Sequence, residues 1–219
     1  MKYCKRCVYP EVAVNLSIDD DGICSSCRSF EEFEKLSPSF WKKRQKRFDE
    51  IINEKLKNNK SNYDCIVPVS GGKDSYYQTH VMVSNYGLKP LLVTYHGNNY
   101  LPSGDYNRDR MREVFSADHI VYGPSIDVLR KLNRIGFKKM GDMNWHAHCG
   151  IFTVPIQLAV KFNIPLIIWG EVAWDISGMH SPGDFVEFSA RVRHEHSLRG
   201  YELFDFIDDP KDKLTEKDM

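Results

Sequence analysis

Short apolar runs alternate with amphipathic stretches over most of the chain beyond Lys60. Runs rich in valine, isoleucine, leucine and aromatic residues predict strands, and apolar positions three and four residues apart predict the helices between them. The predicted strands are 63–69, Leu91–Tyr95, His119–Tyr122 and Pro165–Trp169, and the predicted helices are 74–86, 105–116, 125–138 and 150–162. Alternation of this kind with short connections predicts an α/β fold with a doubly wound parallel sheet.

A second pattern covers the part before Lys60, where polar residues dominate and two apolar stripes recur at helical spacing. The stripes are Phe30, Phe33 and Leu36 in one stretch and Trp41, Phe48, Ile51, Ile52 and Leu56 in the next. Between them, Ser37 and Pro38 supply a cap and a first helical residue for the second helix. We therefore expect four parts: a ribbon at 1–28, a helical connector at 29–60, the α/β domain at 61–207 and a charged tail at 208–219 that lies outside the core.

Cysteine spacing indicates what the ribbon binds. Four of the six cysteines form two Cys-x-x-Cys pairs separated by sixteen residues, Cys4 with Cys7 and Cys24 with Cys27. This spacing is typical of a four-thiolate zinc site, in which two turns each present two thiolates to one ion. Four protein ligands leave no open coordination position, so the predicted Zn²⁺ is structural. An iron–sulfur cluster, a redox pair and two disulfides are the alternatives.

Charge and hydropathy narrow the function classes. Lysine plus arginine and aspartate plus glutamate number 30 each in 219 residues, so no net charge draws the chain to nucleic acid or to an anionic membrane. The longest apolar runs are too short to span a bilayer, and no apolar stretch follows Met1 as a signal peptide requires. We expect a cytoplasmic protein, whose cysteines stay reduced or bind metal.

The junction after the first predicted strand carries the strongest functional signal. Its candidate ligand-binding residues are Ser70, Gly71, Gly72, Lys73, Asp74 and Ser75. Glycine lets the backbone turn sharply and lets a ligand approach the amide groups, and free amides at a helix start favour an anion. The serines add hydroxyl donors, the lysine a cation and the aspartate a carboxylate for Mg²⁺. The glycine spacing differs from that of the Walker motif. The simpler alternative is an ordinary turn capped by Asp74.

Further polar residues are expected at the same edge of the sheet, because ligands of doubly wound folds bind beyond the carboxyl ends of the strands. The segments at this edge are Thr94–Asn99, Gly123–Ser125 and Gly170–Asp175. Two more sets of residues are candidates for binding a second ligand at this edge. They are His146 and His148 before the fourth helix, and Glu187, Arg191, Arg193, His194 and His196. Arginines and a helix start suit a carboxylate or phosphate, and a surface position without function is the alternative for each.

The string SGGKDS resembles the pyrophosphate loop of the PP-loop ATP pyrophosphatases. Members of that superfamily cleave ATP between its α and β phosphates, attach AMP to a carbonyl oxygen and let a nucleophile displace it. The resemblance implies that residues 70–75 hold the β,γ-pyrophosphate, with Lys73 and Asp74 as catalytic residues and Mg²⁺ as cofactor. It also implies that Thr94 and Tyr95 meet the nucleoside, largely through the backbone, and that Gly170 and Glu171 lie near the phosphates.

A longer set of motifs resembles the N-acetyl sugar amidotransferases of lipopolysaccharide O-antigen and pseudaminic or legionaminic acid biosynthesis. The motifs are CxxCVxP from Cys4, DxxGxCxxCR from Asp19, YDCIVPVSGGKDSYY at 63–77, Pro90–Tyr95, Lys131–Arg134, Asn144–His146, Ile164–Glu171 and Arg193–Glu195. This resemblance covers most of residues 1–207. It implies an enzyme that converts the acetamido group of a sugar into an acetamidino group, with AMP and pyrophosphate as products.

The ammonia for such a reaction is expected from a separate glutaminase partner. Lys2 follows Met1, where a glutaminase of the N-terminal-nucleophile type needs cysteine. One alternative function is tRNA thiolation, since some PP-loop enzymes of that class also begin with paired CxxC motifs. Zero net charge argues against tRNA binding, and Cys65 and Cys149 are a thin basis for sulfur transfer. Another alternative is a catalytically incomplete nucleotide-binding subunit, because the sugar amidotransferases generally continue past the equivalent of Met219.

Overall fold

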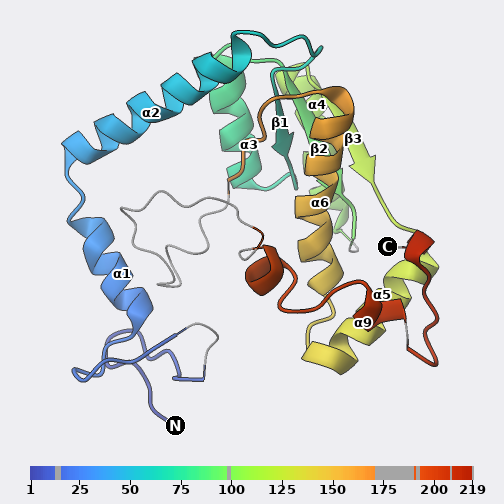
Figure 1. The fold of residues 1–219 in the computed structure, drawn as a ribbon. Helices are drawn as coiled ribbons and strands as arrows, with labels where there is room; N and C mark the ends of the chain where they lie inside the picture. Colours follow the sequence, from blue (N-terminus) through green and yellow to red (C-terminus); the bar gives the residue numbers. More distant parts are fainter. Residues whose placement is uncertain (13–15, 98–99, 171–189, 191–192, 208, 219) are drawn as a thin grey trace. The chain divides into compact units, whose positions relative to one another are not determined.

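The computed structural model describes residues 1–12, 16–97, 100–170, 190, 193–207 and 209–218, which divide into two compact units (Figure 1). The first contains the described residues up to Glu54. The second runs from Lys55 to Gly170 and includes the described residues of the C-terminal part.

Two tight turns and two helices form the first unit. Tyr3 and Pro10 pair as an antiparallel bridge around the first cysteine pair, and Ile18 pairs with Cys24 around a turn at Gly22, whose φ of 81° suits glycine. Helix α1 then spans Ser25–Glu34 and α2 spans Pro38–Leu56. The Ser37 hydroxyl accepts a hydrogen bond from the Phe40 amide at 3.2 Å, which confirms the predicted cap. The first helix begins inside the stretch predicted as ribbon.

A parallel sheet forms the centre of the second unit. Strands β1 (Cys65–Pro68), β2 (Pro90–Tyr95) and β3 (Asp118–Tyr122) lie in that order, with Ile66 opposite Leu91 and Leu92 opposite His119. The predicted fourth strand is reduced to one parallel bridge between Ile66 and Ile167. Its two backbone hydrogen bonds, both 2.8 Å, place residues 166–168 on the side of β1 away from β2. The spatial order is therefore fourth segment, β1, β2, β3.

Helices follow each strand, as predicted. They are α3 (Lys73–His80), continued by the π-helical turn η1 (Val81–Asn85), α4 (Pro102–Phe115), α5 (Ile126–Met140) and α6 (Trp145–Phe162). Shorter turns follow in the C-terminal part: the π-helical η2 (Arg193–Ser197), α9 (Phe204–Ile207) and the 3-10 turn η3 (Glu216–Asp218). Helix α6 begins five residues before the predicted start at Gly150. Among the described helices, none combines the length and apolar character that crossing a bilayer requires.

The central strand β2 is buried on both faces, as expected of a doubly wound fold, whereas β3 at the edge is partly exposed. Along β2, Leu91, Val93 and Tyr95 pack in one cluster with Ala147 and Val154 of α6, which crosses that face (Figure 1). The alternate β2 residues point to the opposite face and are buried as well, since every position of β2 is buried. Continuous burial of this kind is typical of a strand covered on both sides.

The C-terminal segment contradicts the expectation that it lies outside the core. Leu214 is 4 % exposed and packs in a cluster with Trp145 and Phe206, whose rings stack at 4.1 Å. Asp212 is also buried and accepts hydrogen bonds from Arg134 and Lys138 of α5, and these lower the pKa of its carboxyl to about 2, the Arg134 bond most. The charged composition of this segment predicted that it would be exposed to solvent. Instead, Asp212 pairs with basic side chains of α5.

Candidate functional site

The glycine-rich loop lies at the topological switch point of the sheet. β1 has β2 on one side and residues 166–168 on the other, so the order of the segments along the sheet reverses at β1. In open α/β sheets a ligand crevice forms outside the carboxyl ends of the strands at such a point. Residues 70–72 follow β1 at its carboxyl end and lead directly into α3.

Gly71 is required at its position for two independent reasons. Its φ of 82° is in the left-handed region, and a Cβ there would lie 2.7 Å from the Arg108 amide nitrogen and 2.9 Å from the Arg108 Cα. The loop is thus packed directly on the backbone of α4. At Asn107, which precedes Arg108, the backbone carbonyl accepts a hydrogen bond of 2.6 Å from the Tyr76 hydroxyl, and this bond ties α3 to α4. The loop therefore has a fixed position between two helices.

Among the described residues, no side chain caps the first amides of α3. The cap residue is Gly72, which has no side chain to offer them. The Ser75 hydroxyl donates to the Gly72 carbonyl at 2.9 Å, and the Ser70 hydroxyl oxygen accepts from the Gly72 amide at 3.3 Å. Ser75 thus stabilises the loop from within, whereas the sequence predicted it as a donor to the ligand. The uncapped helix start remains suited to an anion.

Lys73 and Asp74 extend from the same helix start into solvent. Their side chains are 88 % and 75 % exposed, and the lysine Nζ lies 2.7 and 2.9 Å from the two carboxylate oxygens. An exposed ion pair of this kind contributes little stability, so a ligand can separate the two groups at small cost. The pair then offers a cation for a phosphate and a carboxylate for a divalent metal.

Replacing Gly71 with alanine is expected to damage this loop more than replacing Gly72. The left-handed φ and the contact with α4 backbone atoms, which cannot rotate away, give an expected loss of about 2–4 kcal/mol in the free energy of unfolding. At Gly72, φ is −79° and the added Cβ would lie 3.3 Å from the movable Ser70 hydroxyl. Urea denaturation of both variants measures the difference, and equal losses would contradict the role given to Gly71.

Thr94 and Tyr95 are brought to the same edge of the sheet, but their side chains are buried. The Thr94 hydroxyl donates to the Val69 carbonyl at 2.5 Å and lies 2.9 Å from His119 Nε2. Burial, followed by the nearby Arg108 charge, lowers the pKa of His119 to about 4, so this imidazole is neutral and its Nε2–H donates to the threonine. Only the backbone of these two β2 residues is left for contact with a ligand.

His146 belongs to the core, and His148 to the surface. The Nε2–H of His146 donates to the Asn133 amide oxygen at 2.7 Å, and its Nδ1 accepts from the Tyr95 hydroxyl at 3.2 Å. Burial lowers the pKa of His146 and raises that of Tyr95. The Tyr95 ring packs against the Cα positions of Gly97 and Gly150, where a Cβ would overlap it. The two histidines therefore point to different sides of α6, because residues two positions apart in a helix are rotated by about 200° about its axis.

The remaining predicted residues have mixed outcomes. Gly170 lies against α3 near the loop, since a Cβ there would be 2.5 Å from Gln78 Oε1, and Gln78 Nε2 donates to the Pro68 carbonyl. Arg193 and His194 are exposed in η2, and His194 Nδ1 lies 3.0 Å from Glu202. Other candidates lie outside the described residues or side chains, namely Asn98, Asn99, Glu171–Asp175, Glu187, Arg191 and His196.

Sequence reasoning missed two charged residues beside the loop, Asp105 and Arg108. Arg108 is buried together with Met111, three residues later on the same side of α4. An arginine at an apolar position of a helical stripe was the available signal, because charged side chains are buried only when paired.

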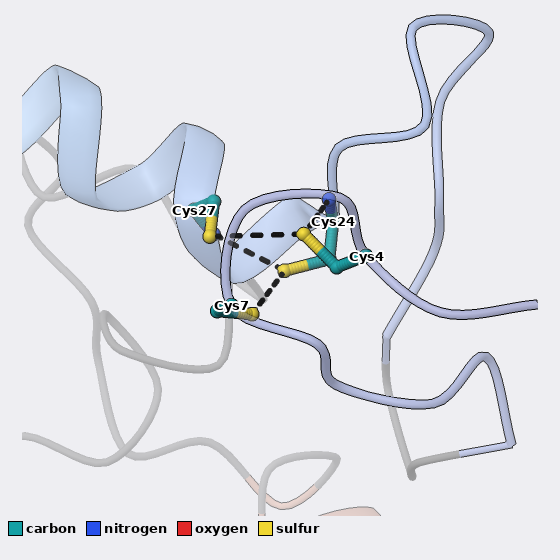
Figure 2. Close-up of side chains that lie close together, drawn as sticks. All are labelled: Cys4, Cys7, Cys24 and Cys27. Atoms are coloured by element: carbon teal, nitrogen blue, oxygen red, sulfur yellow. Dashed lines mark hydrogen bonds between the residues drawn. The ribbon is translucent and has the colours of Figure 1, made fainter.

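The four paired cysteines form one cluster in the first unit (Figure 2). Their sulfur atoms all lie within 4.8 Å of one another, with Cys4 to Cys27 at 3.9 Å and Cys7 to Cys24 at 3.6 Å. The first pair comes from a turn, as predicted. The second comes from the start of α1, where Cys24 is the cap residue and Cys27 lies in the first turn. This differs from the expectation of two similar turns.

The cluster fits a single metal ion. Thiolates that share one zinc ion at about 2.3 Å stand about 3.8 Å apart in a tetrahedron. Backbone amides of Arg6 and Cys24 point to the Cys4 sulfur at 3.4 and 3.3 Å. Backbone hydrogen bonds, that of Cys7 most, lower the pKa of Cys4 to about 6, which favours the thiolate that a metal needs, whereas burial raises the pKa of Cys24 and raises that of Cys27 to about 12. The structure thus brings together the predicted ligands in a closed site.

Of the two other cysteines, Cys65 is buried and Cys149 is half-buried. Burial raises the pKa of Cys65 and of Cys149 to about 12. Cys149 also donates to the Ser197 carbonyl at 3.5 Å. Neither sulfur is an activated nucleophile, since activation requires a lowered thiol pKa.

Comparisons with known proteins give no family assignment. No family model matches the chain, and no curated protein matches it. Among solved structures, it is similar to an NH3-dependent NAD synthetase from Campylobacter jejuni in complex with nitrate, with 14 % identity, a TM-score of 0.41 and coverage of 57 % of this chain and 55 % of that one. The chain thus spans about half the length of that synthetase. It is also similar to the U34-tRNA thiolase NcsA from Methanococcus maripaludis with its 4Fe–4S cluster, with 14 % identity, a TM-score of 0.31 and coverage of 94 % and 88 %.

Proposed function

We propose that this chain is an ATP-dependent, AMP-forming amidotransferase of the PP-loop type that acts on an N-acetyl sugar. The observation that carries the nucleotide part is the loop at residues 70–75. Gly71 is held against α4, the first amides of α3 are uncapped, and Lys73 and Asp74 extend into solvent at the switch point of the sheet. Together these groups suit a magnesium-bound polyphosphate.

In the proposed reaction the acetamido oxygen of the sugar attacks the α-phosphorus of ATP, and the bond to the β-phosphate breaks. The α3 amides and Lys73 hold the departing pyrophosphate and stabilise its charge. Asp74 would hold Mg²⁺, which supplies charge neutralisation on the phosphate oxygens. Ammonia then adds to the activated imidate carbon, loses protons to solvent, and AMP leaves with the former amide oxygen. The product is an acetamidino sugar.

The sugar as acceptor is supported by the motifs at Cys4, Asp19 and 63–77 and by the neutral net charge. The buried thiol of Cys65 and the half-buried thiol of Cys149, both with a raised pKa, weigh against tRNA thiolation. We propose His148, Arg193 and His194 as surface residues for the sugar or its phosphate, with Arg191 beside them in sequence. Both ring nitrogens of His146 are hydrogen-bonded to Tyr95 and Asn133, so this residue stabilises the core and does not contact the sugar. A separate glutaminase supplies the ammonia, and the four-cysteine site holds structural zinc.

The proposal is tested by incubating the chain with MgATP, ammonium and a panel of acetamido sugars, free and nucleotide-linked. Pyrophosphate and AMP release that depends on one sugar, with a mass change from acetamido to acetamidino, supports it. Release that depends on tRNA instead would overturn the sugar assignment. ATP binding with no turnover on any acceptor would indicate a nucleotide-binding subunit.

A further inference from the structure

Arg28 directly follows the last cysteine of the cluster and has no part in the adenylation chemistry above. Its three side-chain nitrogen atoms donate to three different carboxylates: Nε to Asp19 at 2.8 Å, Nη2 to Asp21 at 2.8 Å and Nη1 to Glu31 at 3.2 Å. A long side chain loses conformational entropy when it is held in one place, and an exposed ion pair adds little stability. The strength of any one pair therefore does not explain an arginine held at three points.

The Glu31 carboxylate connects Arg28 to the first cysteine pair. One of its oxygen atoms accepts from Arg28, and the other accepts from Arg6 Nη1 at 2.8 Å. Arg6 lies between Cys4 and Cys7 in the chain, and its backbone amide points to the Cys4 sulfur at 3.4 Å. Two arginines and one carboxylate thus join the segment with the first cysteine pair to the helix that follows the second.

Asp19 connects Arg28 to the turn that leads into Cys24. Its Oδ2 atom accepts from Arg28, while its Oδ1 atom accepts from the Ile23 amide at 2.8 Å. The backbone carbonyl of Asp19 also accepts from the Gly22 amide at 2.9 Å. One residue therefore closes the turn before Cys24 and fixes the position of Arg28.

These contacts give a role to both ends of the DxxGxCxxCR motif, whose cysteines alone were assigned above. A metal site binds more tightly when its ligands are held in place by hydrogen bonds beyond the ligands themselves, and losing such a partner costs about 10–100-fold in affinity. The ligands here come from two separate segments, and the contacts of Arg28 join both. We propose that Arg28 is a positioning residue of the metal site, which holds the two cysteine pairs at the separation that one tetrahedral ion requires.

The test measures two properties of the full chain. Zinc affinity is obtained by competition with a chromophoric chelator, and the ligand-field absorption bands of bound Co²⁺ report how the four sulfur atoms are arranged. Arg28→Ala should weaken Zn²⁺ binding about 10–100-fold and change the Co²⁺ bands. Arg28→Lys should behave nearly as the alanine variant does, because an ammonium keeps the charge but lacks the planar fork that reaches three carboxylates.

Asp19→Asn is a milder variant, since an amide oxygen can still accept from the Ile23 amide while the charge that faces Arg28 is lost. It should weaken Zn²⁺ binding less than Arg28→Ala does. Arg47→Ala is the matched control, because Arg47 is also exposed, lies in the same unit and pairs with Glu50 at 3.6 Å. It should keep the wild-type affinity and the wild-type Co²⁺ bands. Thermal melting of each metal-loaded variant checks that the fold is retained.

Wild-type zinc affinity in Arg28→Ala would overturn the proposal, and so would full rescue by lysine, since charge alone would then be sufficient. Weaker binding with unchanged Co²⁺ bands would also overturn it, because Arg28 would then stabilise the unit without setting the geometry of the site. If Arg28→Ala does not fold, Arg28→Lys and Asp19→Asn decide between these outcomes. Metal binding needs neither ATP nor a sugar, so a negative result here leaves the proposed function standing, and the reverse also holds.

Discussion

Replacing Asp74 with asparagine is expected to lower sugar-dependent pyrophosphate release at least about 100-fold, because the variant loses the carboxylate that would hold Mg²⁺ on the phosphates. The side chain is 75 % exposed and its described partner is Lys73, so the change leaves the core untouched. Loss of a negative charge from the first turn of α3 should cost only about 0.3–1 kcal/mol of stability. Steady-state kinetics with the coupled pyrophosphate assay gives the result.

Asp127→Asn is the control for this variant, since it removes the same charge from the first turn of α5. It should keep wild-type kinetics. If Asp74→Asn keeps wild-type kinetics as well, the loop does not position the metal, and the alternative of an ordinary strand-to-helix turn is the better interpretation.

The second large effect concerns the four-cysteine cluster. Cys24→Ser is expected to abolish stoichiometric metal binding and to unfold the turns and helix start around it. Structural zinc contributes about 10–16 kcal/mol of binding free energy to small folded modules, far more than the few buried side chains of this unit. Serine is a preferred helix cap, so the variant keeps the cap of α1 and loses only the thiolate.

Metal content per chain by elemental analysis, together with amide hydrogen exchange of residues 1–34, measures this effect. Cys149→Ser is the matched control, because it keeps the donor to the Ser197 carbonyl and lies outside the cluster. Full zinc content in Cys24→Ser would refute the assigned ligand. If the wild type instead contains iron and absorbs visible light, the site holds an iron–sulfur cluster and not zinc. The cysteine spacing leaves this alternative open.

The order and type of the elements in the α/β domain were predictable, because strand runs and helical stripes differ in period. The fourth strand was overestimated, since residues 166–169 are only half-buried, Pro165 is exposed, and the segment makes one bridge to β1. The start of α6 was not predicted, because the polar residues of its first turn are typical of a loop. In the structure, Trp145 and His146 of this turn are buried. Periodicity carries no information about which partner a polar side chain finds.

The same limit applies to the site. Glycines at 71 and 72 predicted a turn with open amides, and the cysteine spacing predicted the cluster, because both depend on local chain geometry. The pairing of Arg134 with Asp212 and the contact of Gly71 with Arg108 join residues far apart in sequence. Neither could be read from spacing, and they decide where the C-terminal segment docks and what supports the loop.

The place of β1 in the sheet also has a consequence for how the chain folds. β1 can pair with β2 once residue 95 is available, but its other edge stays open until Leu166 and Ile168, about a hundred residues after β1 itself, are available. An apolar strand with an open edge is prone to pairing with other chains, and contacts between distant residues form slowly. During synthesis, β1, which leads into the glycine-rich loop, therefore keeps one edge unpaired, and we expect this interval to be the stage at which pairing with other chains is most favoured.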